Sequence, residues 1–282
     1  MIEIDQLVVR YGNFTAVDGL SLSVRAGELF GFLGPNGAGK STTMRVLIGI
    51  LRPSEGTVEI AGCRIPEQLD RIKPIFGYVA DTENHMEEFT GRQNLELFAD
   101  LYGVSRHVVQ ESLVRLELDE AADVLVRRYS KGMRKKLLLA RELLHGPKIL
   151  YLDEPTANLD SHSTELVRNI LRDLAASGVT VFVTTHNMEE VEEICDRVAI
   201  LYRGKLVECD SPASFVARYA EHKVTVRYEK EKQPFRETLN LNNKSERTRL
   251  AEIVQHENCT AIQSRDFNFD DVFRKLTGQE FT

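Results

Sequence analysis

The sequence has no stretch of about 18 consecutive apolar residues, the length that a membrane-spanning helix needs. It also lacks, at its N-terminus, the charged segment followed by an apolar one that marks a secretion signal. We therefore expect neither a membrane span nor secretion. Contact with a membrane would have to come through a partner protein.

Cysteine is scarce, and the chain holds only Cys63, Cys195, Cys209 and Cys259. No two of these residues have the spacing of a metal site, and their surroundings are apolar or strand-like. We expect them to be reduced structural thiols, as in a cytosolic protein.

Basic residues are outnumbered, because 36 Lys and Arg face 43 Asp and Glu, giving a net charge of -7. This charge argues against non-specific binding of nucleic acid by the whole surface. The fractions of hydrophobic residues, 42%, and of charged residues, 28%, are ordinary for a soluble globular protein. A chain of 282 residues is long for one compact domain, so we expect a main domain and a smaller accessory one.

The most informative segment that is present is a glycine-rich loop. Its residues are Gly34, Pro35, Asn36, Gly37, Ala38, Gly39, Lys40, Ser41 and Thr42. This order of glycines, Lys and Ser is the pattern of a loop whose backbone N–H groups wrap the phosphates of a nucleotide. Lys40 would then pair with the β- and γ-phosphates, and Ser41 would bind Mg²⁺. The alternative is a glycine-rich turn that only precedes a helix.

The segments around this loop predict an α/β fold. Residues 2–30 read as short strands in an N-terminal β region, and the apolar run at residues 29–33 before the loop reads as a buried strand. The periodic run at residues 41–51 predicts a helix that Pro53 stops, with its N-terminus facing the phosphates. A helical insertion is expected at about residues 90–145, between two strand-bearing halves.

Two later strands end in polar residues. The apolar run at residues 149–152 leads into Asp153 and Glu154, and the run at residues 179–184 leads to His186. Strands that alternate with helices predict a mostly parallel sheet, whose ligands gather at the carboxyl ends of the strands. We therefore expect these three polar side chains at one edge of the sheet.

These motifs occur in the order and at the spacing of one family. Residues 2–215 closely resemble the ATPase subunits of ATP-binding-cassette transporters, which implies a phosphate-loop NTPase core. The ATP-binding cassette is expected at residues 1–220, with its helical subdomain at about 90–145. A small C-terminal α+β accessory or regulatory domain is expected at residues 221–282.

The resemblance implies a role for each polar residue of the ATP site. Tyr11 matches the aromatic residue that stacks on adenine, and Asp153 with Ser41 matches the Mg²⁺ site. Glu154 matches the general base that activates water, and His186 matches the residue that contacts the γ-phosphate. The alternatives are a strand tyrosine with no ligand, an acid pair in a structural salt bridge and a structural histidine.

A second set of residues resembles the family's signature motif, which reaches the ATP bound by an opposite cassette. It consists of Ser130, Lys131, Gly132 and Met133, where Lys and Met replace the family's usual Gly and Gln. Asp160 matches the residue that communicates across the dimer. The resemblance therefore implies a second ATPase subunit, in a homodimer or a heterodimer.

Three segments narrow the resemblance to the export-type branch, whose ATPases serve a separate membrane permease. They are the Tyr-Ser-Lys-Gly-Met form at residues 129–133 and the segments 89–95 and 270–278. The implied place of action is the cytoplasmic face of the cell membrane. Cassette proteins of translation or DNA repair remain a second class, although the single cassette, the short insertion and the acidic charge disfavour nucleic acid as a partner. A small-molecule kinase or a GTPase would lack the signature and His186 motifs.

One position departs from the family pattern. After residues 76–79 the family normally has Gln or Glu at the loop that touches both the Mg²⁺ site and the permease, whereas this chain has Ala80 and Asp81. Asp81 begins an acidic segment with Glu83, Glu87 and Glu88. We expect this loop to dock a basic helix of the permease, with Asp81 as the coupling residue; the alternative is a plain solvated loop.

Overall fold

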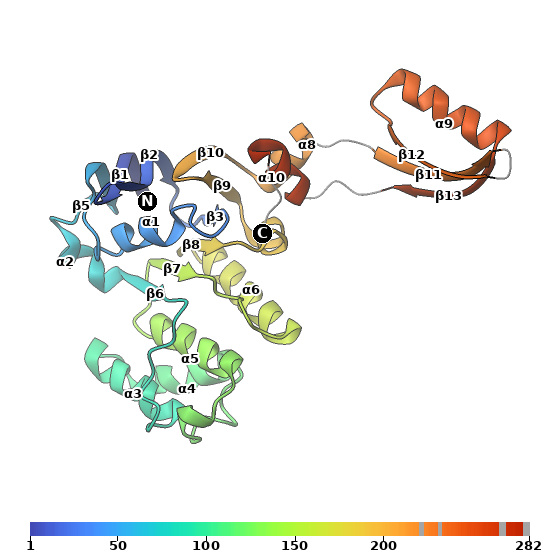
Figure 1. The fold of residues 1–282 in the computed structure, drawn as a ribbon. Coiled ribbons are helices and arrows are strands. Elements are labelled where there is room, and N and C mark those ends of the chain that lie inside the picture. Colours follow the sequence, from blue (N-terminus) through green and yellow to red (C-terminus); the bar gives the residue numbers. More distant parts are fainter. Residues whose placement is uncertain (220–222, 231–232, 265–268, 279–282) are drawn as a thin grey trace. The chain divides into compact units, whose positions relative to one another are not determined.

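The computed structural model describes residues 1–219, 223–230, 233–264 and 269–278, and these form two compact units, Met1–Ser211 and Pro212–Thr282 (Figure 1). The boundary lies earlier than the expected residue 220, because α8 (Pro212–Tyr219) packs on α10 (Phe269–Thr277). The rings of Phe215 and Phe269 in these helices are 5.5 Å apart. No helix among the described residues is long and apolar enough to cross a membrane.

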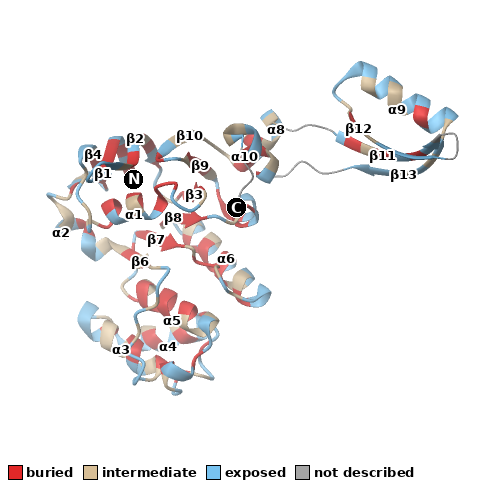
Figure 2. Ribbon diagram, in the orientation of Figure 1, coloured by how far each residue is buried: buried red, intermediate tan, exposed pale blue. Residues whose placement is uncertain are grey.

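A six-stranded sheet forms the centre of the first unit, in the order β10-β9-β3-β8-β7-β6. Its strands are β3 (Leu29–Leu33), β6 (Phe76–Val79), β7 (Ile149–Asp153), β8 (Thr180–Thr185), β9 (Arg197–Tyr202) and β10 (Lys205–Asp210). All neighbours pair in parallel except β9 and β10. The three central strands β3, β7 and β8 are buried along their whole length, which explains their continuous apolar sequence (Figure 2). The predicted α/β fold with a mostly parallel sheet is confirmed.

The predicted N-terminal antiparallel region is a second sheet, in the order β2-β1-β4-β5. It consists of β1 (Ile2–Tyr11), β2 (Phe14–Val24), β4 (Glu55–Ile60) and β5 (Cys63–Ile65). The two-residue turn Gly12 and Asn13 joins β1 to β2, so Tyr11 and Phe14 lie opposite each other. Both side chains are exposed at this end of the sheet.

Helix α1 (Lys40–Leu47) follows the glycine-rich loop and packs against both sheets, with Met44, Val46 and Leu47 in their common core. The helix is shorter than the periodicity to residue 51 predicts. Gly49 adopts a left-handed conformation with φ 77°, and the N–H groups of Ile50 and Leu51 both donate to the carbonyl of Arg45. This is how a glycine commonly ends a helix, before Pro53 is reached.

The predicted helical insertion lies between β6 and β7 and contains three main helices, grouped beyond the β6 edge of the sheet (Figure 1). They are α3 (Gly91–Tyr102), α4 (Arg106–Arg115) and α5 (Lys131–Leu143). Thr90, Ser105 and Ser130 cap their N-termini, and Thr90 forms a capping box with Gln93. The other helices of this unit are α2 (Leu69–Ile72), η1 (Lys73–Ile75), η2 (Val126–Arg128), α6 (Ser161–Ala176) and α7 (Met188–Ile194).

The second unit contains a three-stranded antiparallel sheet of β11 (Lys223–Lys230), β12 (Gln233–Asn240) and β13 (Asn258–Ser264), in the order β12-β11-β13. Helix α9 (Lys244–His256) covers one face of this sheet, where Ile253 packs on Val224, Val226 and Tyr228. Strands and a helix around one small core give the predicted α+β fold.

Candidate nucleotide site

The glycine-rich loop connects β3 to α1, so the first N–H groups of the helix face the space beside the loop. Gly39, the residue before the helix, has φ 105°, and a Cβ there would lie 2.7 Å from the carbonyl oxygen of Ala16. Only glycine fits this backbone and this close approach. The loop therefore presents main-chain donors at a helix N-terminus, the arrangement that favours phosphate.

Lys40 is buried, and its ammonium donates to the carbonyls of Gly34 and Pro35. Its Nζ atom lies 4.0 Å from a carboxylate oxygen of Glu154. Burial lowers the pKa of Lys40, and the carboxylates of Glu154 and Asp153 act in the opposite direction. The loop thus holds a cation that faces the acid pair, as a site for phosphate requires.

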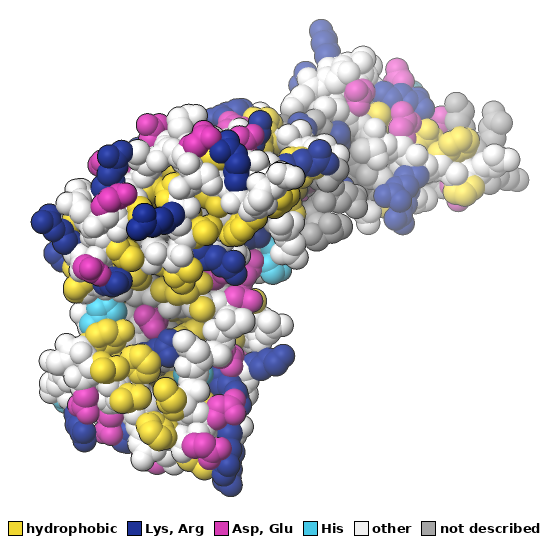
Figure 3. Space-filling view, turned by 60° about the vertical axis from the view of Figure 1, so that its left-hand side comes forward, with side chains coloured by type: hydrophobic (Ala, Val, Ile, Leu, Met, Phe, Trp, Pro, Cys, Tyr) yellow, Lys and Arg dark blue, Asp and Glu magenta, His cyan; other side chains and the backbone are white. Residues whose placement is uncertain are grey.

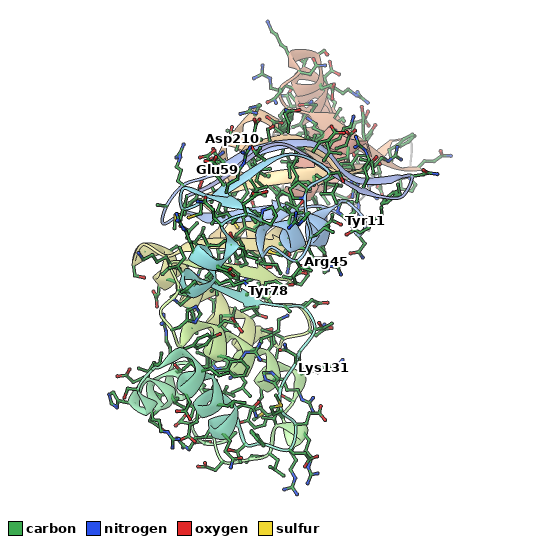
Figure 4. All side chains as sticks on the ribbon, turned by 90° about the vertical axis from the view of Figure 1, so that its left-hand side faces the viewer. Tyr11, Arg45, Glu59, Tyr78, Lys131 and Asp210 are labelled. Atoms are coloured by element: carbon green, nitrogen blue, oxygen red, sulfur yellow. The ribbon has the colours of Figure 1, made fainter. Side chains whose placement is uncertain are left out.

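A pocket of about 190 Å³ lies beside the loop. Its lining consists of Tyr11, Phe14, Ala16, Pro35, Asn36, Gly37, Gly39, Lys40, Ser41 and Thr42. Tyr11 is thus in the pocket, as its predicted role requires, and Figure 4 shows its side chain at the edge of the unit. Phe14 was not predicted; the signal in the sequence was the two-residue turn, which places it opposite Tyr11.

The acid pair lies at the carboxyl end of β7. Asp153 is buried and accepts a hydrogen bond from the hydroxyl of Thr184 on the neighbouring β8. Glu154 has a left-handed backbone with φ 51°, and its N–H donates to the carbonyl of Thr184 at 2.9 Å. Thr184 therefore holds the carboxylate of Asp153 and the backbone of Glu154 in place, a role that sequence reasoning missed although the residue ends a predicted strand.

His186 and Glu154 are in direct contact. The Nδ1 atom of His186 lies 2.8 Å from one carboxylate oxygen of Glu154, and the other oxygen accepts from the backbone N–H of His186 at 3.4 Å. The structure thus brings together Lys40, the adjacent acids Asp153 and Glu154, and His186, from three distant parts of the sequence. Their roles stay predictions.

The signature residues form a separate group. Ser130 caps α5 by accepting from the N–H of Met133 at 3.1 Å, and Lys131 is exposed (Figure 4). Asp160 caps α6 in the same way through Ser163, which lowers the pKa of Asp160. A Cβ on Gly132 would lie 3.9 Å from the carboxylate of Asp160. Within the described ranges, no hydrogen bond or ion pair joins residues 130–133 to the phosphate loop.

Asp81 follows β6 and is mostly exposed. Two of the other acids in its segment already have partners, since Glu87 pairs with Arg134 at 2.8 Å and Glu88 pairs with Arg127 at 3.1 Å. These contacts reduce the negative charge that the loop presents. The expected attraction for a basic helix therefore depends on Glu83 and on Asp81, whose carboxylate itself lies 4.0 Å from the ammonium of Lys135.

The oxygen donors expected for Mg²⁺ are the hydroxyl of Ser41 and the carboxylate of Asp153, and hard oxygen ligands suit this ion. In the part of the chain that the structure describes, no group of three or more His, Cys, Asp or Glu residues could hold a metal by itself. The donor set fits an ion whose other ligands come from phosphate and water.

The chain resembles known proteins over most of its length. A family model described as ABC transporter matches residues 17–157. A fluoroquinolones export ATP-binding protein of Mycobacterium tuberculosis (strain ATCC 25618 / H37Rv) is 35% identical over 100% of this chain and 95% of its own length. A Nod factor export ATP-binding protein I of Ralstonia nicotianae (strain ATCC BAA-1114 / GMI1000) is 34% identical over 99% and 94%.

Solved structures give the same picture. An ATP-binding subunit of an ABC transporter has a TM-score of 0.71 and 26% identity, over 78% of this chain and 93% of its own. A dimeric ATP-binding cassette in a post-hydrolysis state, bound to ADP and Pi, has a TM-score of 0.68 and 26% identity, over 75% and 98%. The resemblance predicted from the motifs is confirmed: the chain belongs to the ABC transporter family and is one of its ATP-hydrolysing cassette subunits.

Proposed function

We propose that the chain powers export through a separate membrane permease, as one of two cassettes that enclose ATP between them. One observation carries this proposal: the phosphate loop, the acid pair and His186 meet at one site, whereas the signature residues lie in a separate group. One chain therefore has two surfaces that can each contact an ATP molecule from one side, the phosphate-loop site and the signature residues. A second cassette, identical or different, encloses each ATP from the other side.

In the proposed site, Lys40 and the loop N–H groups bind the phosphates, and Tyr11 with Phe14 contacts the adenine. Ser41 and Asp153 would hold Mg²⁺, which would neutralise charge on the phosphate oxygens. Glu154 accepts the proton of the attacking water. His186, which contacts Glu154 at 2.8 Å, keeps this carboxylate oriented and contacts the γ-phosphate.

On the other surface, Ser130 and Gly132 offer a hydroxyl and a backbone N–H at the N-terminus of α5, where an anion is favoured. Lys131 adds a positive charge that is unfavourable for the helix dipole alone and favourable beside a phosphate. We assign these residues to the ATP of the opposite cassette. Asp160 lies close to Gly132 and caps α6, so it transmits the binding of that ATP to α6.

The permease is proposed to bind the helical part of the cassette at the cytoplasmic face of the membrane. Hydrophobic side chains gather there on the surface shown in Figure 3. Among the exposed residues of this part are Met86, Phe89, Leu101 and Tyr102. Exposed apolar side chains in such a cluster mark a protein interaction surface. The named relatives export compounds of different kinds, so the proposal is export as such.

Purification of the tagged chain from membranes tests this function. We expect a membrane protein with several apolar spans to co-elute, and the reconstituted pair to hydrolyse ATP faster than the cassette alone. Co-elution that persists in high salt and is lost on changing Leu101 to Glu would support binding through the apolar surface. If no membrane protein co-elutes with the tagged chain, the export function is contradicted.

Replacing Asp81 with Ala is expected to leave ATP affinity within about twofold of wild type and to weaken the stimulation of hydrolysis by the permease. The reason is that Asp81 is exposed in the loop after β6 and touches no residue of the phosphate loop. The measurement compares ATPase rates with and without the permease. Equal stimulation of the variant and the wild type would leave Asp81 as part of a solvated loop.

The second unit is expected to be dispensable for ATP binding, because every residue proposed to bind nucleotide lies before it. The chain should be cut after Ser211 and not after Ala220, since α8 would otherwise lose its partner α10 and expose Phe215. Calorimetry should then give nearly normal ATP affinity. A folded truncated chain that no longer binds ATP would refute this separation of roles.

A further inference from the structure

Lys135 is a buried lysine that the proposed ATP site does not use. It lies on α5, two residues after the last signature residue Met133, and its side chain is 6% exposed. Three oxygens surround its Nζ atom: the carbonyl of Ala80 at 3.2 Å, the carbonyl of Asp153 at 3.4 Å and the carboxylate of Asp81 at 4.0 Å. One ammonium therefore joins the signature helix, the Asp81 loop and the end of β7.

Nearby carboxylates offset the cost of burying the charge of Lys135. Burial lowers its pKa, whereas the carboxylates of Asp81, Asp153, Glu83 and Glu154 raise it. A buried ammonium without partners would strongly destabilise the fold, so these acids are what make the position tolerable. These acids include both members of the acid pair, Asp153 and Glu154. Lys135 is therefore a buried cation close to both of them.

The bond to Asp153 is the most informative of the three. The carbonyl of Asp153 and the N–H of Glu154 belong to the same peptide group. Lys135 holds the carbonyl side at 3.4 Å, and the carbonyl of Thr184 accepts the N–H at 2.9 Å. A peptide group fixed on both sides sets the backbone of Glu154, whose φ of 51° is otherwise unfavourable.

We propose that Lys135 is a positioning residue for ATP hydrolysis, which transmits movement of the Asp81 loop and of α5 to the peptide group that aims Glu154. This inference rests on the proposed role of Glu154 as the base. When the permease moves Asp81, or a second cassette moves the start of α5, the ammonium moves with them. The carboxylate of Glu154 is then brought into or out of line with its target water.

The next residue of the same helix provides a matched control. Lys136 is also buried, donates to the carbonyl of Glu117 at 3.5 Å and lies 3.9 Å from its carboxylate. It therefore has the same burial and the same kind of ion pair, but its partner lies within the helical part and away from the acid pair. A change at Lys136 reports the cost of losing a buried lysine alone.

The test compares Lys135→Met with Lys136→Met by ATP affinity, ATP turnover and melting temperature. We expect both variants to melt lower, and only Lys135→Met to lose about tenfold or more in kcat, with ATP affinity within about twofold, because small misplacements of a catalytic group cost up to about a hundredfold. Lys135→Gln, which keeps an N–H donor and loses less stability, guards against a variant that fails to fold. It should fall between Lys135→Met and the wild type.

The link to Asp81 is tested by the double variant Asp81→Ala/Lys135→Met. If Asp81 acts through Lys135, stimulation by the permease should be no lower in the double variant than in Lys135→Met alone. Equal kcat losses in Lys135→Met and Lys136→Met, or fully additive effects of the Asp81 and Lys135 changes, would overturn the proposal. A wild-type cassette that does not hydrolyse ATP would instead contradict the proposed function itself.

Discussion

Glu154→Gln is expected to bind ATP almost as well as the wild type and to hydrolyse it about 10²- to 10⁴-fold more slowly. Gln keeps the shape of Glu but does not accept a proton, so binding and chemistry should separate. The side chain already contacts His186 at 2.8 Å, and the amide retains an oxygen for this contact. Because ATP then persists, the variant should accumulate as a two-cassette dimer.

Single-turnover ATP hydrolysis, ATP affinity by calorimetry and molecular mass in the presence of ATP measure the three parts of this result. Glu165→Gln, at an exposed position of α6, is the control for loss of one negative charge. Hydrolysis at the wild-type rate would remove Glu154 from the role of base. A slow variant that also fails to bind ATP would point to a structural role for the acid.

Lys40→Ala should have the second large effect, on ATP binding. Each charge-assisted hydrogen bond from the ammonium to a phosphate contributes roughly 1.5–3 kcal/mol, so the loss of one or two bonds weakens affinity by at least about tenfold. The fold should persist, because Lys40 donates to two loop carbonyls, those of Gly34 and Pro35, and both Lys40 and Pro35 border the pocket.

Calorimetry with ATP, beside a thermal melt, measures this effect. Lys148→Ala is a suitable control, since Lys148 is an exposed lysine outside the pocket. Unchanged ATP affinity in a folded Lys40→Ala variant would contradict the assignment of the phosphate loop. Equal loss in the control would mean that overall charge, and not the pocket, governs binding.

Much of the fold could be predicted because local patterns and tertiary structure agree. The apolar run at residues 149–152 has the length of a buried strand, and it lies inside the sheet, between β8 and β6. Ser130 and Thr90 cap the N-termini of α5 and α3, a position that Ser and Thr commonly occupy. The acids that end β7 lie beside His186 at the end of β8, since neighbouring parallel strands place their carboxyl ends at one edge.

The misses have a common cause, which is that they depend on distant contacts. Nothing in the helical pattern of α5 distinguishes Lys135 from Lys136, yet one reaches Asp153 and the other Glu117. The boundary between the two units follows Ser211, earlier than the expected residue 220, because α8 packs on α10, at the far end of the chain. Phe14 was the exception, because its turn was visible in the sequence.

The left-handed backbone at Glu154 places stability and turnover in conflict. A non-glycine residue in that conformation lowers the free energy of unfolding by on the order of 1–2 kcal/mol, whereas glycine adopts it without this cost. A search for heat-resistant variants would therefore favour glycine at this position and discard the proposed base. Engineering of this cassette for use at high temperature should therefore keep Glu at position 154 and introduce stabilising substitutions in the exposed loops.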